Sequence, residues 1–287
     1  MTPASFPETN GNGSSRGWGR PGRGNVGLLV CGAFLVALLA RGGFFSPAAW
    51  VGFGEKFHQN FILDGRYRML LHVISDPPFS LEESEQSHLY ELAKKHNVIL
   101  MDNIKMVHIH VFNQLLWMTQ GGLIGDILSV NCSISRDDKS RDNILFDLLS
   151  LALVPILKIQ GQDFKNLKIN KTYGPDGVEF ASLFFEYENS NAIVNVGNSI
   201  RVDNQLEVIG TEGTIRSKDK WWRGNYFEVE RTDADHIEVY NTNYAGNGFK
   251  YLLKAVSIML TNDRIDSMGV FEDESVKIAE IMEKVNS

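Results

Sequence analysis

The stretch Gln205–Ile215 (QLEVIGTEGTI), closely followed by Trp221-Trp222, decides the fold. Apolar residues stand at strand spacing on both sides of the Gly-Thr-Glu-Gly segment, as in two strands joined by a tight turn. Gly210 and Gly213 are interpreted as residues that take positive φ at no steric cost. A further strand pattern begins at Tyr226. This part of the chain therefore predicts a hairpin within an antiparallel sheet.

Strand patterns fill the second half of the chain around this hairpin. Residues 126–135 alternate between apolar and polar side chains. One buried face is predicted to carry Leu128, Val130, Cys132 and Ile134. Other strand patterns lie near 164–173, 178–187, 191–200, 205–210, 213–217, 226–231 and 236–241. Helix patterns lie at 143–159, with a bend expected at Pro155, and at 246–261 and 272–285. We therefore expect a mostly antiparallel open sheet backed by helices.

A strand–helix–strand unit precedes this sheet. Met69–Ile74 is an apolar run of strand length, and Val98–Met101 is a second. Between them, Ser80 and Glu83 have the spacing of a capping box, which predicts a helix. Two strands joined by a helix predict a parallel pair with a right-handed crossover. A further helix is predicted over Ile104–Gln120, because glycines follow it as a stop.

The predicted fold class is therefore α+β. A remnant of a parallel Rossmann-type βαβ unit is expected over 67–122, and the sheet domain over 123–287. Residues 1–66 are predicted to be a disordered or unrelated leader, because 1–25 consist largely of Gly, Ser, Pro, Asn and Arg. Three interpretations stay open for the apolar, uncharged residues 26–40: a membrane or export segment, a buried helix, or a piece unrelated to the fold.

Composition and motifs exclude some classes of function. The formal net charge of the 287 residues is −7, which argues against a general nucleic-acid binder with its basic face. Cys31 and Cys132 lie far apart without metal-ligand spacing, so we expect no metal site and two free thiols in a reducing compartment. A cytoplasmic protein is predicted, with membrane anchoring through 26–40 as the alternative.

Several segments together resemble the Gfo/Idh/MocA oxidoreductases. They are His72-Val73-Ile74-Ser75-Asp76-Pro77 with the helix after it, the segment 104–127 (IKMVHIHVFNQLLWMTQGGLIGDI), the helix start at Asp147, the Gly-Thr-Glu-Gly hairpin, Gly248-Phe249-Lys250-Tyr251, and Glu272–Ala279. The resemblance covers about residues 70–285. It implies hydride transfer between NAD or NADP and a sugar, polyol or related substrate. It also implies a homo-oligomer that pairs through the sheet face.

The sequence departs from the family where the chemistry is expected. The glycines of the Gly-rich leader follow no predicted strand, whereas the family's G-x-G-x-x-G fingerprint follows one and lets a pyrophosphate approach a helix N-terminus. Asp76 stands where the family's Glu-Lys-Pro motif has its lysine, beside Pro77 at the cofactor-binding position. Leu151 stands where the family's Asp-x-Gly-x-His element has its histidine. Both family acid–base groups are therefore replaced.

Other residues are candidates to carry the chemistry instead. Lys105 follows a parallel strand, where ligands bind in open α/β sheets, and is predicted to replace the missing lysine. Asp147 lies in an apolar helix, where a carboxylate needs a partner or a wet cleft. The predicted catalytic residues are thus Asp76, Lys105 and Asp147, and the predicted substrate-binding residues are His108, His110, Trp221 and Trp222. For each, an ordinary surface, core or interface role is the alternative.

Three functions follow from these observations. The first is an NAD(P)-dependent oxidoreductase of sugars or polyols that is incomplete or catalytically degenerate. The second is an active oxidoreductase in which Asp76, Lys105 and Asp147 run the chemistry and a partner supplies the nucleotide site. The third is a non-catalytic sheet module for dimerisation or sugar binding, tethered through residues 26–40.

Overall fold

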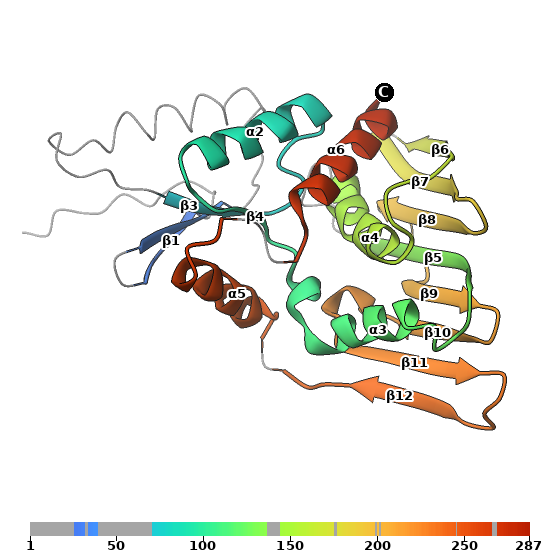
Figure 1. Ribbon diagram of the computed structural model, residues 1–287. Coiled ribbons are helices and arrows are strands. Elements are labelled where there is room, and N and C mark those ends of the chain that lie inside the picture. Colours follow the sequence, from blue (N-terminus) through green and yellow to red (C-terminus); the bar gives the residue numbers. More distant parts are fainter. Residues whose placement is uncertain are drawn as a thin grey trace, which may run out of the picture.

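The computed structural model describes residues 26–31, 34–39, 71–136, 144–174, 177–198, 200, 202–244, 246–265 and 269–287. These residues form a small sheet and a large sheet with helices between and around them (Figure 1). This arrangement confirms the predicted α+β class. The predicted disorder of residues 1–25 and the rest of the leader at 40–66 lie outside the described residues.

The small sheet has four strands in the order β1-β2-β3-β4. Their bounds are Val26–Cys31, Phe34–Leu39, Leu71–Ser75 and Leu100–Asp102. β2, β3 and β4 are parallel, and β1 pairs antiparallel with β2. Helix α2 (Glu83–Lys95) connects β3 to β4. The predicted strand–helix–strand unit is thus present, with two additional strands beside it.

The apolar residues near the start of the chain are strands in this sheet. β2 pairs with β3 from Leu35–Leu71 to Leu39–Ser75, so the segment joins the fold through backbone hydrogen bonds. The interpretation as a buried helix is therefore wrong. A short apolar run suits a buried strand of a parallel sheet equally well, and periodicity alone does not separate the two. No helix within the described ranges is long and apolar enough to cross a membrane.

Helix α5 (Phe249–Thr261) covers the small sheet from the side opposite to α2 (Figure 1). Its buried residues form a compact core with β3 and β4, made of Ile74, Ile99, Met101, Leu252, Val256 and Met259. Burying each such side chain contributes about 1.5–3 kcal/mol, so the C-terminal part of the chain stabilises a sheet formed near its start.

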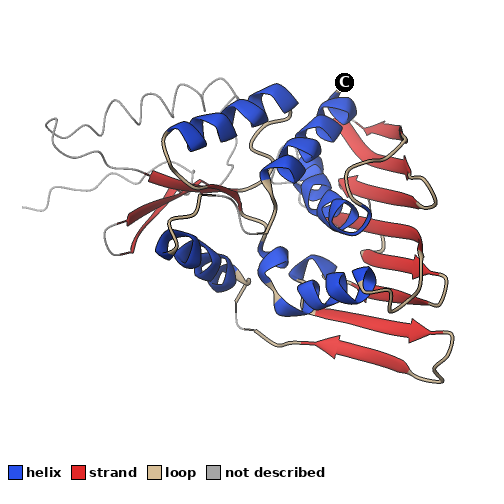
Figure 2. Ribbon diagram, viewed as in Figure 1, coloured by secondary structure: helices blue, strands red, loops and turns tan. Residues whose placement is uncertain are grey.

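The large sheet has eight strands in the order β12-β11-β10-β9-β5-β8-β7-β6. Their bounds are β5 Ile127–Arg136, β6 Asn166–Gly174, β7 Gly177–Glu186, β8 Asn191–Asn198, β9 Gln205–Gly210, β10 Gly213–Lys218, β11 Tyr226–Arg231 and β12 Ile237–Asn241. Neighbours pair antiparallel except β5 and β8, which are parallel. Helices α3 (His110–Gln120), α4 (Ile144–Gln160) and α6 (Glu272–Asn286) lie on one face of this sheet (Figure 2).

Helix α4 is apolar around most of its circumference because it is covered on all sides. It packs on β5, β7 and β8 and is covered by α3 and α6. Pro155 is buried inside the helix, which continues to Gln160. A helix that is hydrophobic all round belongs in a core, and α4 forms the centre of this one.

The alternation predicted for β5 holds for three of four residues. Val130, Cys132 and Ile134 are fully buried, whereas Leu128 is 44% exposed. The pairing of β5 with β9 shifts register between Ile127 and Ser129, which is a β-bulge. An extra residue turns the side chains before it to the other face, so the placement of Leu128 on the buried face was wrong.

The Gly-Thr-Glu-Gly hairpin is present, but its glycines are needed for close backbone contact and not for positive φ. Neither Gly210 nor Gly213 has positive φ. A Cβ on Gly210 would stand 2.1 Å from the carbonyl oxygen of Ile124, and one on Gly213 would stand 2.6 Å from that of Glu230. The glycines therefore permit close backbone approach. The turn docks on the end of the α3–β5 loop, where the amide of Glu212 donates to Ile124 at 2.8 Å.

Two predicted helix boundaries are also corrected. α2 begins at Glu83, and the Ser80 hydroxyl accepts from the amide of Glu82 and donates to Glu85 instead of forming a box with Glu83. The helix predicted over Ile104–Gln120 is divided into the 3-10 helix η1 (Lys105–His108) and α3. Its break is stabilised by Asn113, whose side chain donates to the carbonyls of residues 107 and 109.

Candidate functional site

The candidate site lies beyond the carboxyl ends of β3 and β4, where the small sheet meets the large one (Figure 1). Asp76 and Pro77 follow β3 directly, and Asn103 and Lys105 follow β4. Parallel strands end at the same edge of a sheet, which is where ligands bind in open α/β sheets. The topology thus brings together two short segments that 27 positions separate in the sequence.

Lys105 is the half-buried cation of this site. Burial lowers the pKa of its ammonium group, the negative charge of Asp76 raises it, and the positive charge of Arg136 lowers it. The ammonium therefore lies within electrostatic reach of a carboxylate and a guanidinium. Its stem packs beside Gly248 at the start of α5, where a Cβ would stand 3.6 Å from that of Lys105.

Asn103, which the sequence analysis did not single out, ties the two segments together. Its Nδ2 donates to Oδ1 of Asp76 at 2.6 Å. Its own Oδ1 is buried and has no hydrogen-bond partner among the described residues. A buried acceptor without a partner is costly, unless a ligand hydroxyl or water donates to it. The Pro77–Pro78 peptide bond beside Asp76 is cis.

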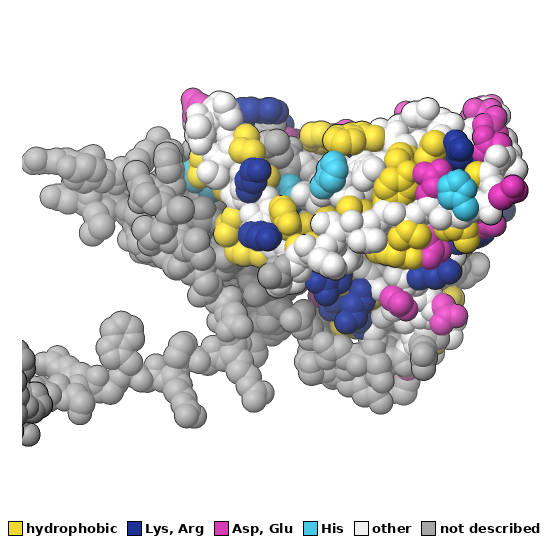
Figure 3. All heavy atoms as spheres, turned by 90° about the horizontal axis from the view of Figure 1, so that it is seen from below, with side chains coloured by type: hydrophobic (Ala, Val, Ile, Leu, Met, Phe, Trp, Pro, Cys, Tyr) yellow, Lys and Arg dark blue, Asp and Glu magenta, His cyan; other side chains and the backbone are white. Residues whose placement is uncertain are grey.

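Arg136 and the tryptophan pair form the wall of the site on the large sheet. Trp221 is only 2% exposed, and its Nε1 donates to the carbonyl of Ser133 at 2.9 Å. Trp222 is half-buried, meets Trp221 edge-on at 5.9 Å between ring centroids, and has the Arg136 guanidinium 5.8 Å from its own centroid. Trp221 is thus a core residue, whereas Trp222 presents a ring beside charged groups. Basic side chains gather on the face seen from below, with acidic ones beside them (Figure 3).

The two histidines predicted to bind substrate lie in different surroundings. His110 is exposed at the start of α3 and meets Trp117 edge-on at 6.4 Å. His108 is half-buried in η1, and burial together with the charge of Lys158 lowers its pKa to about 4. Its Nε2 is buried without a hydrogen-bond partner in the described structure. His108 is therefore neutral at neutral pH, and the two imidazoles do not act as a pair.

Asp147 lies in the first turn of α4 and is half-buried. It does not belong to the charges that shift the pKa of Lys105, which are Asp76 and Arg136. Leu151, one turn later, packs against the main hydrophobic core. The structure therefore brings Asp76 within electrostatic reach of Lys105.

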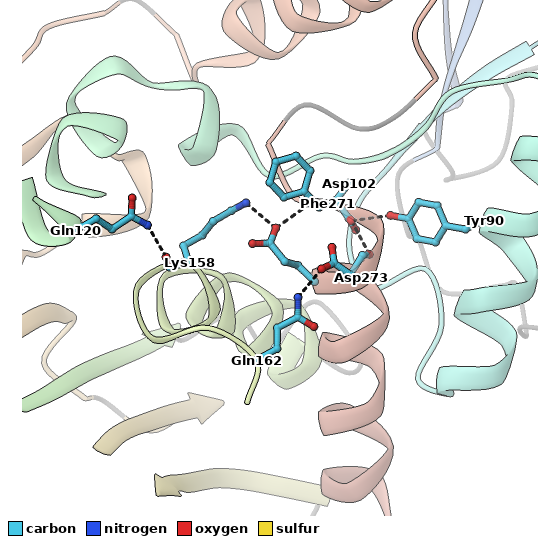
Figure 4. Close-up of polar contacts among 9 residues, drawn as sticks. Tyr90, Asp102, Gln120, Lys158, Gln162, Phe271 and Asp273 are labelled. Atoms are coloured by element: carbon cyan, nitrogen blue, oxygen red, sulfur yellow. Dashed lines mark hydrogen bonds and ion pairs between the residues drawn. The ribbon is translucent and has the colours of Figure 1, made fainter. Parts of the chain in front are cut away.

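A buried polar cluster behind the site holds α6 to the small sheet (Figure 4). Asp102, the last residue of β4, accepts from the Ser275 hydroxyl at 2.7 Å and from the Tyr90 hydroxyl at 3.4 Å. Gln86 of α2 donates to Ser275 at 2.8 Å. Burial raises the pKa of Asp102 to about 6, although both hydroxyl donors lower it. Its neighbours are alcohols, so nothing in the cluster compensates a carboxylate charge fully.

A second polar contact joins α6 to α4. Lys158 and Glu274 form an ion pair at 2.6 Å, and their side chains are 12% and 11% exposed. The same glutamate accepts from the amide of Phe271 at 2.8 Å, and the Lys158 ammonium lies 4.3 Å from the Phe271 ring centroid. Figure 4 shows Lys158 extending toward the start of α6. A single lysine in an apolar helix gave no sequence signal for this pair.

Among the described residues, no group of three or more His, Cys, Asp or Glu side chains is placed to hold a metal ion.

Comparison with solved structures identifies the architecture. A 3-ketoreductase from Actinomadura kijaniata, solved with NADP and TDP-benzene, superposes with a TM-score of 0.63 at 18% identity over 75% of this chain and 70% of that one. An oxidoreductase from Agrobacterium radiobacter, solved with NAD+, L-tartaric acid and magnesium, has a TM-score of 0.59 at 15% identity over 74% and 69% of the two chains. The fold is that of the Gfo/Idh/MocA oxidoreductases.

The sequence comparisons add a shorter match. A dTDP-3,4-didehydro-2,6-dideoxy-alpha-D-glucose 3-reductase from Streptomyces violaceoruber is 26% identical over 87 residues, which is 30% of this chain. The matched part spans a quarter of that reductase. No family model matches the sequence.

The described residues do not offer the pyrophosphate-binding turn that an NAD(P)-binding Gfo/Idh/MocA enzyme requires. β3 is followed by Asp76-Pro77-Pro78 and β4 by Asn103-Ile104, and neither turn contains a glycine through which a backbone approaches phosphate. Asp76 carries a carboxylate where the resemblance implies a lysine. These two turns therefore do not supply a phosphate site, and no step through the dinucleotide is derived.

Proposed function

We propose that this chain binds a sugar- or polyol-type ligand between its two sheets, as an incomplete or catalytically degenerate relative of the NAD(P)-dependent Gfo/Idh/MocA oxidoreductases. The observation that carries the proposal is the position of Lys105 within electrostatic reach of both Asp76 and Arg136, at the ligand-binding edge of the parallel strands. Related folds solved with TDP-benzene and with L-tartaric acid support a small polyhydroxy or keto ligand.

Each polar group of the site has a role in this proposal. The Lys105 ammonium donates to ligand hydroxyl or carbonyl oxygens, and burial lowers its pKa from the ordinary value of a lysine. Asn103 holds Asp76 and offers its unpartnered Oδ1 to a ligand hydroxyl. Trp222 provides a flat apolar surface for a sugar ring. Asp147, His108 and His110 remain predicted contributors.

The replacements at the family's catalytic positions support weak or absent dehydrogenase activity. Asp76 repels the developing oxyanion that the family's lysine would stabilise. Leu151 has no exchangeable proton and packs in the core. Lys105 compensates for the lost charge but comes from another segment. The alternative of an active enzyme, completed by NAD or NADP bound with a partner's help, requires Lys105 to act as acid or base.

A non-catalytic sheet module is the second candidate function. Ile237 and Val239 of β12 are 53% and 52% exposed, and both lie on the sheet face opposite to the helices. Exposed apolar side chains on an open sheet face suit a homo-oligomeric contact. In this function the chain dimerises through the sheet, and the tether predicted at residues 26–40 is not needed, because β1 and β2 pair within the small sheet.

Fluorescence titration separates these functions. We expect no saturable binding of NADH or NADPH at micromolar concentration, together with saturable binding of a polyol or hexose that quenches tryptophan emission. Lys105→Gln should remove hexose binding, while Lys254→Gln, an exposed lysine of α5, should leave it unchanged. Micromolar NADPH binding would overturn the proposal that the chain is an incomplete or degenerate oxidoreductase. Hexose binding that survives Lys105→Gln would overturn the proposed ligand site.

A further inference from the structure

A hollow of about 690 Å³ lies at the end of β9, β10 and β11, beside the candidate site. Its wall is made of Asn204, Ser217, Lys218, Asp219, Lys220, Trp222, Arg223, Asn225, Tyr226 and Glu228. The turn from β10 into the 3-10 helix η2 (Trp221–Arg223) contributes several of these residues. This is also the end at which β5 terminates with Arg136, so the hollow and the candidate site share Trp222.

Several hydrogen-bond donors in the hollow are not used within the described structure. Lys220 is exposed and forms no ion pair with another described residue. The Nε of Arg223 is buried without a partner, although its Nη2 donates to the carbonyl of Gly246 at 3.2 Å. Asn204 uses its Oδ1 to accept from the amide of Ser135, and its Nδ2 has no partner among the described residues. The Lys220 ammonium and the Asn204 Nδ2 are the donors available to an anionic ligand, whereas Arg223, whose Nε is buried, contributes its positive charge.

The acidic residues of the hollow do not cancel these donors. Glu228 accepts from the hydroxyl of Tyr226 and lies 3.7 Å from the ammonium of Lys218, so its charge is engaged within the wall. Asp219 is exposed at the rim. Lys220 and Arg223 thus remain as positive charges around a space that would hold a small ligand group.

Trp222 links the hollow to the candidate site. Its ring is held edge-on by Trp221, which is itself anchored through Ser133. A rigid indole that borders both spaces suits the ring of a sugar or base. The Arg136 guanidinium lies 5.8 Å from the centroid of this ring, and its positive charge also acts on Lys105.

The geometry points to a phosphate subsite: Lys220, Arg223 and Asn204 bind the phosphate of a phosphorylated or nucleotide-linked sugar whose ring lies on Trp222. This inference rests on the proposed function, because the sugar hydroxyls would reach Lys105. A phosphomonoester and a sugar diphosphate share the required chemistry, which is an anionic phosphate attached to a polyhydroxy ring. Charge-assisted hydrogen bonds to phosphate are stronger than the neutral contacts of a free sugar.

Calorimetric titration of the full chain tests the subsite. The probes are glucose, glucose 6-phosphate, uridine diphosphate glucose and inorganic phosphate. We expect the phosphorylated probes to bind about tenfold or more tightly than glucose, since one charge-assisted hydrogen bond suffices for that ratio. Lys220→Gln should remove this advantage, and Lys254→Gln should retain it. Lys220 is exposed and unpaired, so its substitution leaves the fold intact.

The outcomes distinguish the subsite from the proposed function. Equal affinity for glucose and its phosphates, or an advantage that survives Lys220→Gln, overturns the subsite. If Lys105→Gln removes glucose binding under those conditions, the proposed function still stands. If Lys220→Gln weakens phosphate-ester binding while Lys105→Gln changes nothing, the subsite stands and the function proposed at Lys105 fails. Absence of binding by every probe overturns both. Comparing glucose 6-phosphate with uridine diphosphate glucose identifies which phosphate source the subsite accepts.

Discussion

At the scale of single residues, Lys105 illustrates how the site differs from its sequence pattern. Its side chain stands beside the residue that replaces the family's lysine, and Asp76 raises its pKa while burial and Arg136 lower it. The sequence around Lys105 alone suggests a solvated helix residue, because its partners are distant in the chain: Asp76 follows β3 and Arg136 ends β5. The parallel pairing of β3 with β4 brings Asp76 to Lys105, and the end of β5 adds Arg136.

The pH dependence of ligand binding should report this arrangement. Binding that needs the charged ammonium is lost as the pH rises through the pKa of Lys105. Removing the Asp76 charge takes away the interaction that raises this pKa, so Asp76→Asn should move the loss of binding to lower pH. Glucose titrations over a range of pH measure the shift. Movement to higher pH, or no movement, would show that the two groups do not interact, and Asp203→Asn, an exposed carboxylate, serves as the control.

At the scale of elements, the Gly-Thr-Glu-Gly hairpin is held by close contact with the α3–β5 loop. Gly210→Ala would place a methyl group 2.1 Å from the carbonyl oxygen of Ile124, which is backbone and cannot rotate away. Overpacking of this kind costs about 1–3 kcal/mol. We expect that loss in the free energy of unfolding by urea denaturation. Glu212→Ala, an exposed change in the same turn, should stay within about 0.5 kcal/mol, and equal effects of both would contradict the close-contact explanation.

The start of α6 depends on a buried carboxyl group at the end of β4. The pKa of Asp102 is raised from 3.8 to about 6, so the folded state binds more protons than the unfolded state between these values. This group's contribution to stability therefore falls as the pH rises through that window. Asp102→Asn removes the contribution and should make stability less dependent on pH between about 4 and 6. Thermal unfolding at several pH values measures this, and a slope as steep as in the original protein would contradict it.

At the scale of the whole molecule, α6 connects the two sheets. It contacts α2 beside the small sheet and α4 over the large one, and the Lys158–Glu274 pair lies at the second contact. Removing one partner of a buried ion pair leaves an uncompensated charge, so Lys158→Met alone should cost about 3–5 kcal/mol. The double variant Lys158→Met/Glu274→Leu should recover most of this loss. A double-mutant cycle by denaturation checks it, and additive losses would show that the pair is not coupled.

The fold was largely predictable because its signals are local. The strands of the large sheet, the long apolar helix and the closing helices follow from hydrophobic alternation, turn glycines and helical periodicity. The failures occur where a local pattern has two solutions. Val26–Cys31 and Phe34–Leu39 form strands because a short apolar run fits a strand as well as a helix, and Leu128 is exposed because a bulge reverses the alternation.

The candidate site was predictable only in part, since its groups come from different elements. The sequence by itself determined the order of the strands in the large sheet and of the helices that cover it, because these depend on residue type and spacing. Only the tertiary structure decided that Lys105 lies near Asp76 and Arg136, that Asn103 holds Asp76, and that Trp221 is core while Trp222 faces a hollow. Burial and electrostatic interaction depend on distances in space, and strand pairing sets those distances.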